Sequence, residues 1–373
     1  MSSELPPYAK WVEKINPIDV QNDFNSLLKE LTKNQSEQDV QHLKRIIFFA
    51  RLSAIVGLAT MPMNPMYVFP AIMISFATFV RWTCIGHHVC HGGYNNVIPK
   101  NSQFDRFQFA LGSIWKRLSD WPDWMDVASW NYEHNHLHHY QLNEDTDPDL
   151  VEQNLTFVRE ANIPIVFKYM FVTFFMLTWK WFYYASNTFA NLKAHENKVG
   201  SFAPLTTLYD IVFGNVPKYV SKLEFILRVV SPYFIYQFII LPLPLFCIGL
   251  ILQYNVIHVV DQNELWAEWF FTAHKNATIN LLLGDVITNI HSFICIVTNH
   301  AGEDMYRWRT HAKPLSGAFY IRAIVSSANY SAGNDYIDVL HGWLNYQAEH
   351  HCFPSKYKLH IYICCISHII WLL

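Results

Sequence analysis

The residues of this chain best suited to chemistry are its histidines, which are clustered. The chain has 373 residues and 19 histidines, nine of which lie in three short segments. These segments are Gly86-His87-His88-Val89-Cys90-His91, His134-Asn135-His136-Leu137-His138-His139 and Gln347-Ala348-Glu349-His350-His351. A further histidine, His300, follows Asn299. Because neutral imidazole binds zinc, copper, iron and nickel, the segments predict a metal centre without naming its metal.

Spacing within the segments predicts which histidines bind metal. His87 and His91 are four residues apart and would share one face of a helix, so we favour this pair over His88 with His91. His134 and His138 would likewise share a face while His139 turns aside, an arrangement that can serve two metals. The predicted ligands are His87, His91, His134, His138, His139, His300, His350 and His351. Eight ligands exceed the needs of one four-coordinate zinc and suit two ions with positions left open for oxygen.

The elements that must position these histidines have the composition of membrane helices. Hydrophobic residues make up 51% of the chain and charged residues only 15%. The apolar runs 46–61, 66–81, 225–252 and 277–297 are each close to one bilayer crossing. The uncharged turn 62–65 joins the first two runs. We therefore predict an all-α membrane protein with about four transmembrane helices in two hairpins and a cytosolic, histidine-rich catalytic cap.

The positions of the histidine segments constrain the topology. If they cooperate, they lie on one face of the membrane, so an even number of crossings separates them. The aromatic run 164–186 would add a third crossing between the second and third segments, so we predict that it is interfacial or re-entrant. Lys and Arg in residues 1–45, against none in the turn, favour a cytosolic N-terminal arm. Residues 46–358 are then the membrane domain.

Composition also excludes several classes of function. The net charge is −3, and no run of basic residues is long enough to follow a phosphate backbone, so nucleic acid is not an expected partner. The seven cysteines form no CxxC pair, which argues against a zinc ribbon. The polar N-terminus predicts no cleavable signal peptide.

The three segments together resemble the three histidine boxes of membrane fatty acyl desaturases. The HxxxH pair, the box ending in His138-His139 and the stretch Asn345-Tyr346-Gln347-Ala348-Glu349-His350-His351-Cys352-Phe353-Pro354 carry this resemblance. A third box that begins with Gln347 is similar to that of front-end desaturases. The acidic segment 145–149 and the approach to box three at 325–334 also resemble that group.

The resemblance implies a function and its cofactors. The eight histidines would bind two non-haem iron ions, and O₂ would serve as co-substrate for desaturation of an acyl lipid or acyl-CoA. Gln347 would be a weak ligand or would contact one, and we name His88, Asn299, Asp145 and Asp149 as further candidates near the metals. An external donor, such as cytochrome b5 with its reductase, would supply electrons. The expected location is the endoplasmic reticulum membrane, with the site facing the cytosol.

Some features depart from the family pattern and leave alternatives open. His88 stands where box one usually has Asp, and three residues precede His138-His139 where front-end enzymes more often have two. A sphingolipid desaturase or a lipid hydroxylase of the same fold therefore remains open, as does a metal transporter. We also expect no fused cytochrome b5 domain. The apolar tail 359–373 is atypical, and we expect it to reflect a truncated end.

The remaining aromatic residues and histidines are assigned structural roles. We expect the aromatic stripe 169–184 to form a membrane-interface surface rather than a substrate tunnel. Trp121, Trp124 and Trp130 could line an acyl channel, but packing is the favoured role. His136, His291 and His341 are interpreted as lying outside the metal site.

Overall fold

The computed structural model describes residues 12–200, 203–255, 262–301, 305–330 and 334–356. The expected tail 359–373 lies outside these residues. Within them the chain is helical, and the single β-bridge, between Glu144 and Trp308, belongs to no strand. This agrees with the predicted all-α fold.

The helices differ in length, with a group of longer ones and a larger group of short ones. The long helices are α1 (Pro17–Lys33), α2 (Glu37–Thr60), α3 (Phe69–Val80), α9 (Ile165–Trp179), α10 (Ala185–Glu196), α14 (Leu243–Asn255) and α15 (Gln262–Ile296). The short helices are α4 (His87–Cys90), α5 (Ile114–Asp120), α6 (Val127–Tyr132), α7 (Val151–Asn154), α8 (Thr156–Glu160), α11 (Leu208–Phe213), α12 (Lys222–Phe225), α13 (Ser231–Phe234), α16 (Gly317–Val325), α17 (Asp335–Leu340) and α18 (Gln347–Cys352).

Wider and tighter helical turns join several of these elements. Five π-helical turns are η3 (Arg81–Gly86), η4 (Glu133–Leu137), η6 (Lys180–Tyr184), η7 (Ile226–Val230) and η8 (Ile235–Ile240) in the part of the chain that the structure describes. The 3-10 turns among the same residues include η2 (Pro65–Tyr67), η5 (His138–Tyr140), η9 (Val297–His300) and η10 (Leu344–Tyr346). Because π turns shift the register of a helix, they change which side chains share a face.

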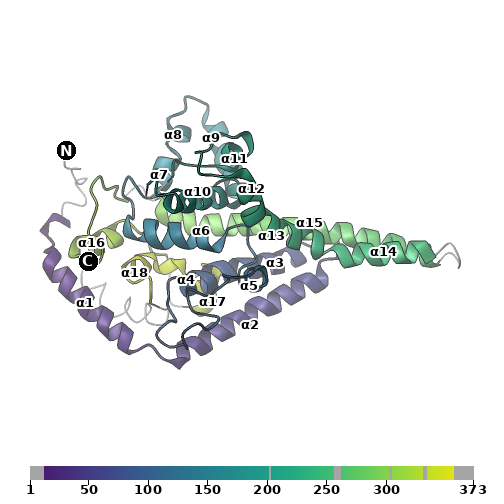
Figure 1. Cartoon of the computed structure of the whole chain (residues 1–373), viewed down its shortest axis with the longest axis horizontal. Coiled ribbons are helices and arrows are strands. Elements are labelled where there is room, and N and C mark those ends of the chain that lie inside the picture. The colour runs from purple at the N-terminus through teal and green to yellow at the C-terminus, as the bar shows by residue number, and fades with distance from the viewer. Residues whose placement is uncertain (1–11, 201–202, 256–261, 302–304, 331–333, 357–373) are drawn as a thin grey trace.

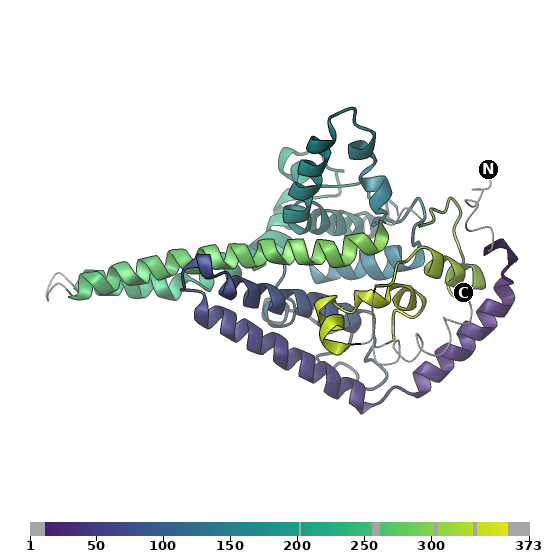
Figure 2. The same cartoon turned by 180° about the vertical axis from the view of Figure 1, so that it is seen from behind.

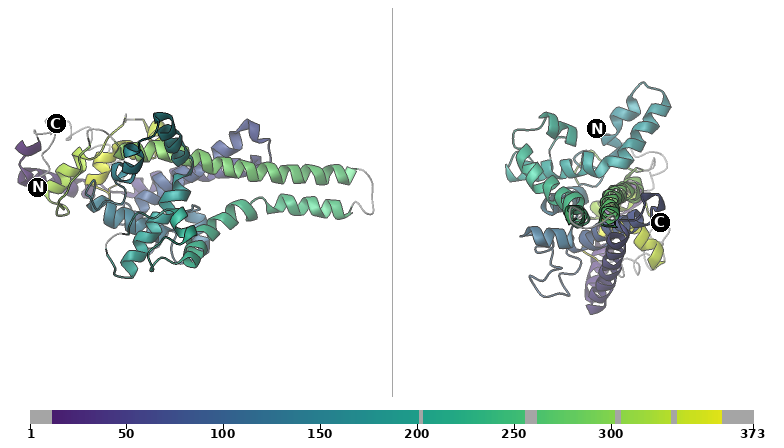
Figure 3. Two further views of the ribbon diagram at one scale, coloured as in Figure 1. Left: turned by 90° about the horizontal axis from the view of Figure 1, so that it is seen from above. Right: turned by 90° about the vertical axis from the view of Figure 1, so that its right-hand side faces the viewer.

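Both predicted helical hairpins are present. Helices α2 and α3 lie side by side, as do α14 and α15 (Figure 1). Gly57 permits the first contact, since a Cβ there would lie 2.8 Å from Cγ1 of Ile74. The second hairpin projects well beyond the rest of the molecule (Figure 3). Asn280 in α15 donates to the backbone oxygens of Met61 and Met63, which fixes the α2–α3 turn against the middle of α15.

Four helical segments among the described residues are long and apolar enough to cross a membrane. They are Phe69–Cys90, Ile165–Glu196, Lys222–Tyr254 and Leu265–His300. Three of them overlap predicted spans. The fourth, Ile165–Glu196, contains the run that we predicted to be interfacial or re-entrant. The predicted span 46–61 is not among the four, because α2 also carries Lys44, Arg45 and Arg51.

The N-terminal arm packs onto the cap. Phe24 of α1 stacks on Tyr320 of α16 and on Phe353 after α18, with ring centroids 4.6 and 5.5 Å apart. The view from behind shows α1 running beside α16 (Figure 2). Residue 45, the predicted domain boundary, lies inside α2, so no break in the structure marks it.

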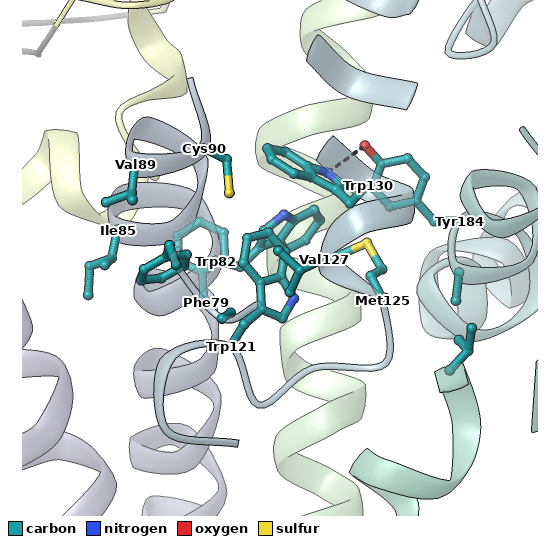
Figure 4. Packing of buried hydrophobic residues seen from close by; sticks show 14 of the residues in the cluster. Phe79, Trp82, Ile85, Val89, Cys90, Trp121, Met125, Val127, Trp130 and Tyr184 are labelled. Atoms are coloured by element: carbon teal, nitrogen blue, oxygen red, sulfur yellow. Dashed lines mark hydrogen bonds between the residues drawn. The ribbon is translucent and has the colours of Figure 1, made fainter. Parts of the chain in front are cut away.

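The largest hydrophobic core lies between the segment that carries the first histidine box and the segment that carries the second. Trp82, Trp121 and Trp130 are buried in one cluster between α3, α4 and α6 (Figure 4). Gly86 allows Trp121 to pack there, since a Cβ at position 86 would lie 2.5 Å from the Trp121 ring. This core fixes the distance between the two helices that carry the first two histidine segments.

Candidate metal centre

The structure brings the eight predicted histidines together as two adjacent buried groups. The first group is His87, His91, His134, His139 and His350, and the second is His138, His300 and His351. Within each group the ligand atoms lie within 4.8 Å of one another. Four segments distant in sequence therefore converge on one place.

The first segment leaves the α3 helix through a π turn. Turn η3 (Arg81–Gly86) is followed directly by α4, where His87 and His91 both face the first group. His88 is buried but belongs to neither group, and its ring centroid lies 5.1 Å from that of Trp343. The structure thus separates His88 from the pair that spacing favoured.

The second segment supplies both groups. The expectation was that His134 and His138 share a face while His139 turns aside. His134 and His138 do lie on one side, with ring centroids 5.4 Å apart and with Asp149 as a third possible ligand close to both. His139 does not turn away, because it joins His134 in the first group while His138 joins the second. The π turn η4 (Glu133–Leu137), which widens the helix just before His138, helps to bring His139 round to His134.

The third segment also divides between the groups. His350 and His351 are consecutive on α18, so they point in different directions, and they join different groups. Gln347 lies one turn before His351, and its Nε2 is 3.0 Å from Nε2 of His300 and 3.2 Å from Nε2 of His351. The oxygen and nitrogen of the Gln347 amide can be exchanged by a flip of the side chain. The oxygen can therefore face Nε2 of His300 and of His351 instead.

Residues around the second group fix the imidazole orientation. Nδ1 of His138 lies 3.0 Å from a carboxylate oxygen of Asp147, and Nδ1 of His351 lies 2.7 Å from Oγ of Ser327. These contacts leave Nε2 of each ring facing the group. Both Asp147 and Ser327 were missed by sequence reasoning.

Asp145, Asp149 and Asn299, which the sequence suggested as neighbours of the metals, lie at different distances from the histidines. Asp149 lies 4.0 Å from Nδ1 of His138, while Asp145 is exposed and pairs with Arg307 at 2.8 Å. Asn299 is buried and donates to the backbone oxygen of Leu344 at 2.7 Å, which joins the end of α15 to the approach to α18. Asp145 is therefore not beside the histidines.

A second buried carboxylate anchors the box-two turn. Glu133 is fully buried, and its Oε2 accepts hydrogen bonds from the side-chain amides of Asn187, at 3.2 Å, and Asn191. Both asparagines lie on α10, so this helix fixes the π turn from behind. Sequence reasoning gave no signal for this contact because the partners are more than 50 residues apart.

Burial keeps most of the histidines neutral. It lowers the pKa of His134, His139 and His350 well below the usual value, and neighbouring imidazoles lower each pKa further. His138 differs: burial opposes its charge, but Asp147 and Asp149 outweigh burial and raise the pKa. Neutral imidazoles keep the lone pairs that a metal needs.

The donor set fits metal ions. Nε2 of His87 lies 2.9 Å from Nε2 of His350 and 3.0 Å from Nε2 of His134. One shared hydrogen cannot satisfy three converging nitrogens, whereas a cation at their centre can. Nε2 of His91 is buried and has no hydrogen-bond partner among the described residues. The first group offers five donors, one more than structural zinc uses, and the second offers four when Gln347 is counted with its three histidines.

A cavity of about 330 Å³ ends at these histidines. Histidines of both groups (His87, His134, His138 and His300) and Gln347 line it, and most of its remaining wall is aromatic or aliphatic. The aromatic part of the wall consists of Trp82, Trp130, Phe157, Phe171, Phe175, Trp179, Phe182, Tyr183, Tyr184, Tyr209 and Phe293. The volume lies in the range of about 300–1,000 Å³ that is common for ligand pockets.

This wall corrects one expectation about the aromatic stripe 169–184. Phe171, Phe175 and Trp179 line the cavity, whereas Tyr169 and Phe174 on the other face of α9 are exposed. The stripe therefore provides both a surface and a cavity wall. Trp130 lines the cavity, while Trp124 instead donates to Asp285 at 2.9 Å, a packing role.

A smaller cavity of about 220 Å³ touches the site from another side. It shares Val151, Leu155 and His300 with the first, and Arg159 and Arg307 border it. The α7–α8 segment therefore separates an apolar cavity from a more polar one.

The three histidines interpreted as lying outside the site are outside both groups. His136 stacks on Tyr132, and His291 stacks on Phe79 at a centroid distance of 3.8 Å. The ring centroid of His341 lies 5.8 Å from that of Tyr330.

Comparison with known proteins gives one match. The family model described as fatty acid desaturase matches residues 62–362, which is about four fifths of the chain and includes all eight grouped histidines. No curated protein and no solved structure matches the chain.

Proposed function

This chain belongs to the fatty acid desaturase family, and we propose that it desaturates a lipid acyl chain at a centre of two non-haem iron ions. In this reaction two adjacent methylenes lose two hydrogens. One O₂, two electrons and two protons are consumed, and two waters are formed. Membership of the family supports oxidoreductase chemistry on a lipid, and the two histidine groups support the metal count.

One observation carries the proposal above the others. A single apolar cavity reaches both histidine groups, so a methylene chain inside it would lie beside both metals. Proximity of this kind is the contribution that a protein makes to cofactor chemistry. A metal transporter would instead place ligands along a path near the bilayer midplane, and the cavity gives no support to such a path.

We assign the residues as follows. His87, His91, His134, His139 and His350 would hold one iron, and His138, His300 and His351, with Gln347, would hold the other. The irons, when bound, supply O₂ activation and the oxidising power for hydrogen removal. Asp147 and Ser327 orient the rings of His138 and His351. The aromatic wall excludes water from the methylenes and holds them in register.

The electrons would come from a separate carrier. We propose cytochrome b5 with its reductase as that carrier, in the endoplasmic reticulum membrane, with the metal centre facing the cytosol. What supports one aqueous face for the metal centre is that His87 and His300 lie close to the ends of Phe69–Cys90 and Leu265–His300, beside the other grouped histidines.

Product analysis in yeast tests the function. We would express the chain with added fatty acids and sphingoid bases and then locate double bonds by mass spectrometry. The expected product is lighter than its precursor by two hydrogen atoms. A product heavier by one oxygen atom would instead assign a hydroxylase, and no product from an iron-loaded preparation would contradict both activities.

Histidine variants make this experiment specific. His138→Ala and His351→Ala should abolish product formation while leaving membrane insertion intact, because each removes a proposed iron ligand. His136→Ala is the matched control, since His136 lies in the same segment but stacks on Tyr132 outside both groups. Turnover retained in His138→Ala or His351→Ala would refute the ligand assignment.

A further inference from the structure

The mouth of the large cavity is apolar. Among the residues that line the cavity, Phe157, Leu205 and Tyr209 are exposed at 58, 47 and 54% of their surfaces. They come from α8, from the loop before α11 and from α11. The cavity therefore opens between these elements through hydrophobic side chains.

The cavity wall contains no cation to receive an anionic carrier. None of the described residues that line it is Lys or Arg. Its ionisable side chains are the four histidines of the metal groups, Asp149 and three tyrosines. A carrier with several phosphate groups, such as a coenzyme A thioester, is normally bound by Arg and Lys.

Two nearby cations, Lys180 and Arg307, are already paired, while Arg159 on α8 borders the smaller cavity and does not line the large one. Lys180 lies behind the wall, where its Nζ is 2.6 Å from Asp123 and 4.6 Å from the centre of the Trp82 ring. Arg307 borders the smaller cavity and pairs with Asp145 at 2.8 Å and with Gln153 at 3.0 Å. Neither cation lies at the mouth.

The protein surface beside the mouth is also hydrophobic. Ile165, Phe167, Met170 and Phe174 are exposed on α9, and Val212 and Phe213 are exposed on α11. Helix α9 is part of the membrane-span candidate Ile165–Glu196 and packs against α15 (Figure 1). Exposed apolar helices of this composition lie in lipid. The mouth therefore faces the bilayer rather than the aqueous phase.

We propose that the acyl chain enters this cavity sideways from the bilayer, methyl end first, while it is still attached to a membrane lipid. The carrier remains in the bilayer outside Phe157, Leu205 and Tyr209. This inference rests on the proposed function and names its substrate class: acyl chains of bilayer lipids, rather than soluble coenzyme A thioesters.

Photolabelling in lipid nanodiscs tests the route. The full-length, iron-loaded protein would be given phosphatidylcholine or ceramide with a diazirine near the acyl methyl end, or the coenzyme A thioester of the same chain. Adducts would be mapped by mass spectrometry. At least one bilayer lipid should label the wall at Phe175 and Trp179 more strongly than the thioester, and the stronger of the two identifies the lipid class.

Variants at the mouth distinguish a block of acyl-chain entry from a general disturbance of helix α11. Tyr209→Arg places a charge where the acyl chain must pass and should lower lipid labelling of the wall by about tenfold. Val212→Arg is the matched control, since Val212 is equally exposed, at 54%, on the same helix but does not line the cavity. Tyr209→Phe should label like the wild type and checks that the site tolerates substitution.

The outcomes separate this inference from the proposed function. Stronger labelling by the thioester, or labelling that Tyr209→Arg does not change, would overturn lateral entry. Labelling requires no turnover, so a labelled wall without any oxidised product would refute the proposed function and support lateral entry. Product formed only from the thioester would support the proposed function and refute lateral entry.

Discussion

At the scale of single residues, the second histidine group has a buried carboxylate, that of Asp147, against one of its rings. Asp147 is buried, its Oδ1 lies 3.0 Å from Nδ1 of His138, and its Oδ2 accepts the backbone N–H of Asn143 at 2.9 Å. One side chain therefore fixes both the ring and the loop that follows box two. Carboxylates in this position set the tautomer and basicity of a metal-binding histidine.

Substitution of this carboxylate should weaken metal binding. Asp147→Asn keeps the size of the side chain but removes its charge, so we expect iron affinity to fall by on the order of 10–100-fold and activity to fall with it. Iron bound per chain, measured across a series of free iron concentrations, checks the prediction.

The same acidic segment provides the control. Asp145→Asn changes an exposed residue that pairs with Arg307, so it should leave iron binding unchanged. Equal iron affinity in both variants would show that Asp147 does not act through His138.

Residue types and spacing predicted which histidines come together better than they predicted the residues around them. All eight histidines that spacing singled out lie in the two groups. Asp145 and Asp149 were named from the acidic segment, whereas Asp147 between them makes the closest contact with His138. The loop geometry decides this, including Asn143 with a φ of +53°, and such geometry is not encoded in residue spacing.

At the scale of elements, helix geometry determines how the histidines divide. Sequence periodicity assumes 3.6 residues per turn, which pairs His134 with His138. The structure keeps this pair together, with ring centroids 5.4 Å apart, and the π turn η4 also brings His139 to face the same group as His134. A π turn leaves no distinct mark in the hydrophobic pattern, so the sequence did not predict where His139 lies.

Helix α1 is a second element whose role follows only from packing. The sequence predicted a cytosolic arm here without indicating its contacts. Phe24 is 2% exposed and lies between α16 and Phe353, two positions after His351. Gly317 of α16 approaches so closely that a Cβ there would overlap the backbone of Pro17. Helix α1 therefore supports the third histidine segment from outside.

Removal of the Phe24 ring should destabilise the cap. Phe24→Ala empties a buried aromatic site, and we expect a loss of about 3–5 kcal/mol of cap stability together with reduced iron binding. Melting temperature and iron content of the purified protein measure the two effects.

Ile18 on the same helix is the control. It is 67% exposed, so Ile18→Ala should change neither quantity. An unchanged melting temperature in Phe24→Ala would contradict the packing role of α1.

At the scale of the whole molecule, the metal centre restricts the topology. Three membrane-span candidates lie between His139 and the end of α15, yet His138 and His300 belong to one group. An even number of crossings must therefore separate them. The second half of Ile165–Glu196 is α10, which is buried against α6 in the cap, so we expect that this segment does not complete a crossing. Counting crossings in the sequence leads to the same expectation.

Cysteine accessibility tests this topology. In a background with Cys247, Cys364 and Cys365 replaced by Ser, Met66→Cys near the α2–α3 turn should react with a membrane-impermeant reagent only from the lumenal side; Cys247 is the exposed thiol among the described residues, and the other two lie outside them. Tyr336→Cys on α17 should react only from the cytosolic side, because α17 lies in the cap. Met66 and Tyr336 are 85 and 84% exposed, so both sites should be reactive. Reaction of both from one side would refute the two-hairpin arrangement.

The central claim is that each histidine group holds one iron ion at the end of an acyl cavity, and metal analysis of the purified protein tests it most directly. We predict one iron for each group in the wild type. His139→Ala should lose the iron of the first group and His351→Ala that of the second, while His136→Ala retains both. A fully loaded wild-type protein that binds a single metal ion, or zinc in place of iron, would contradict the account.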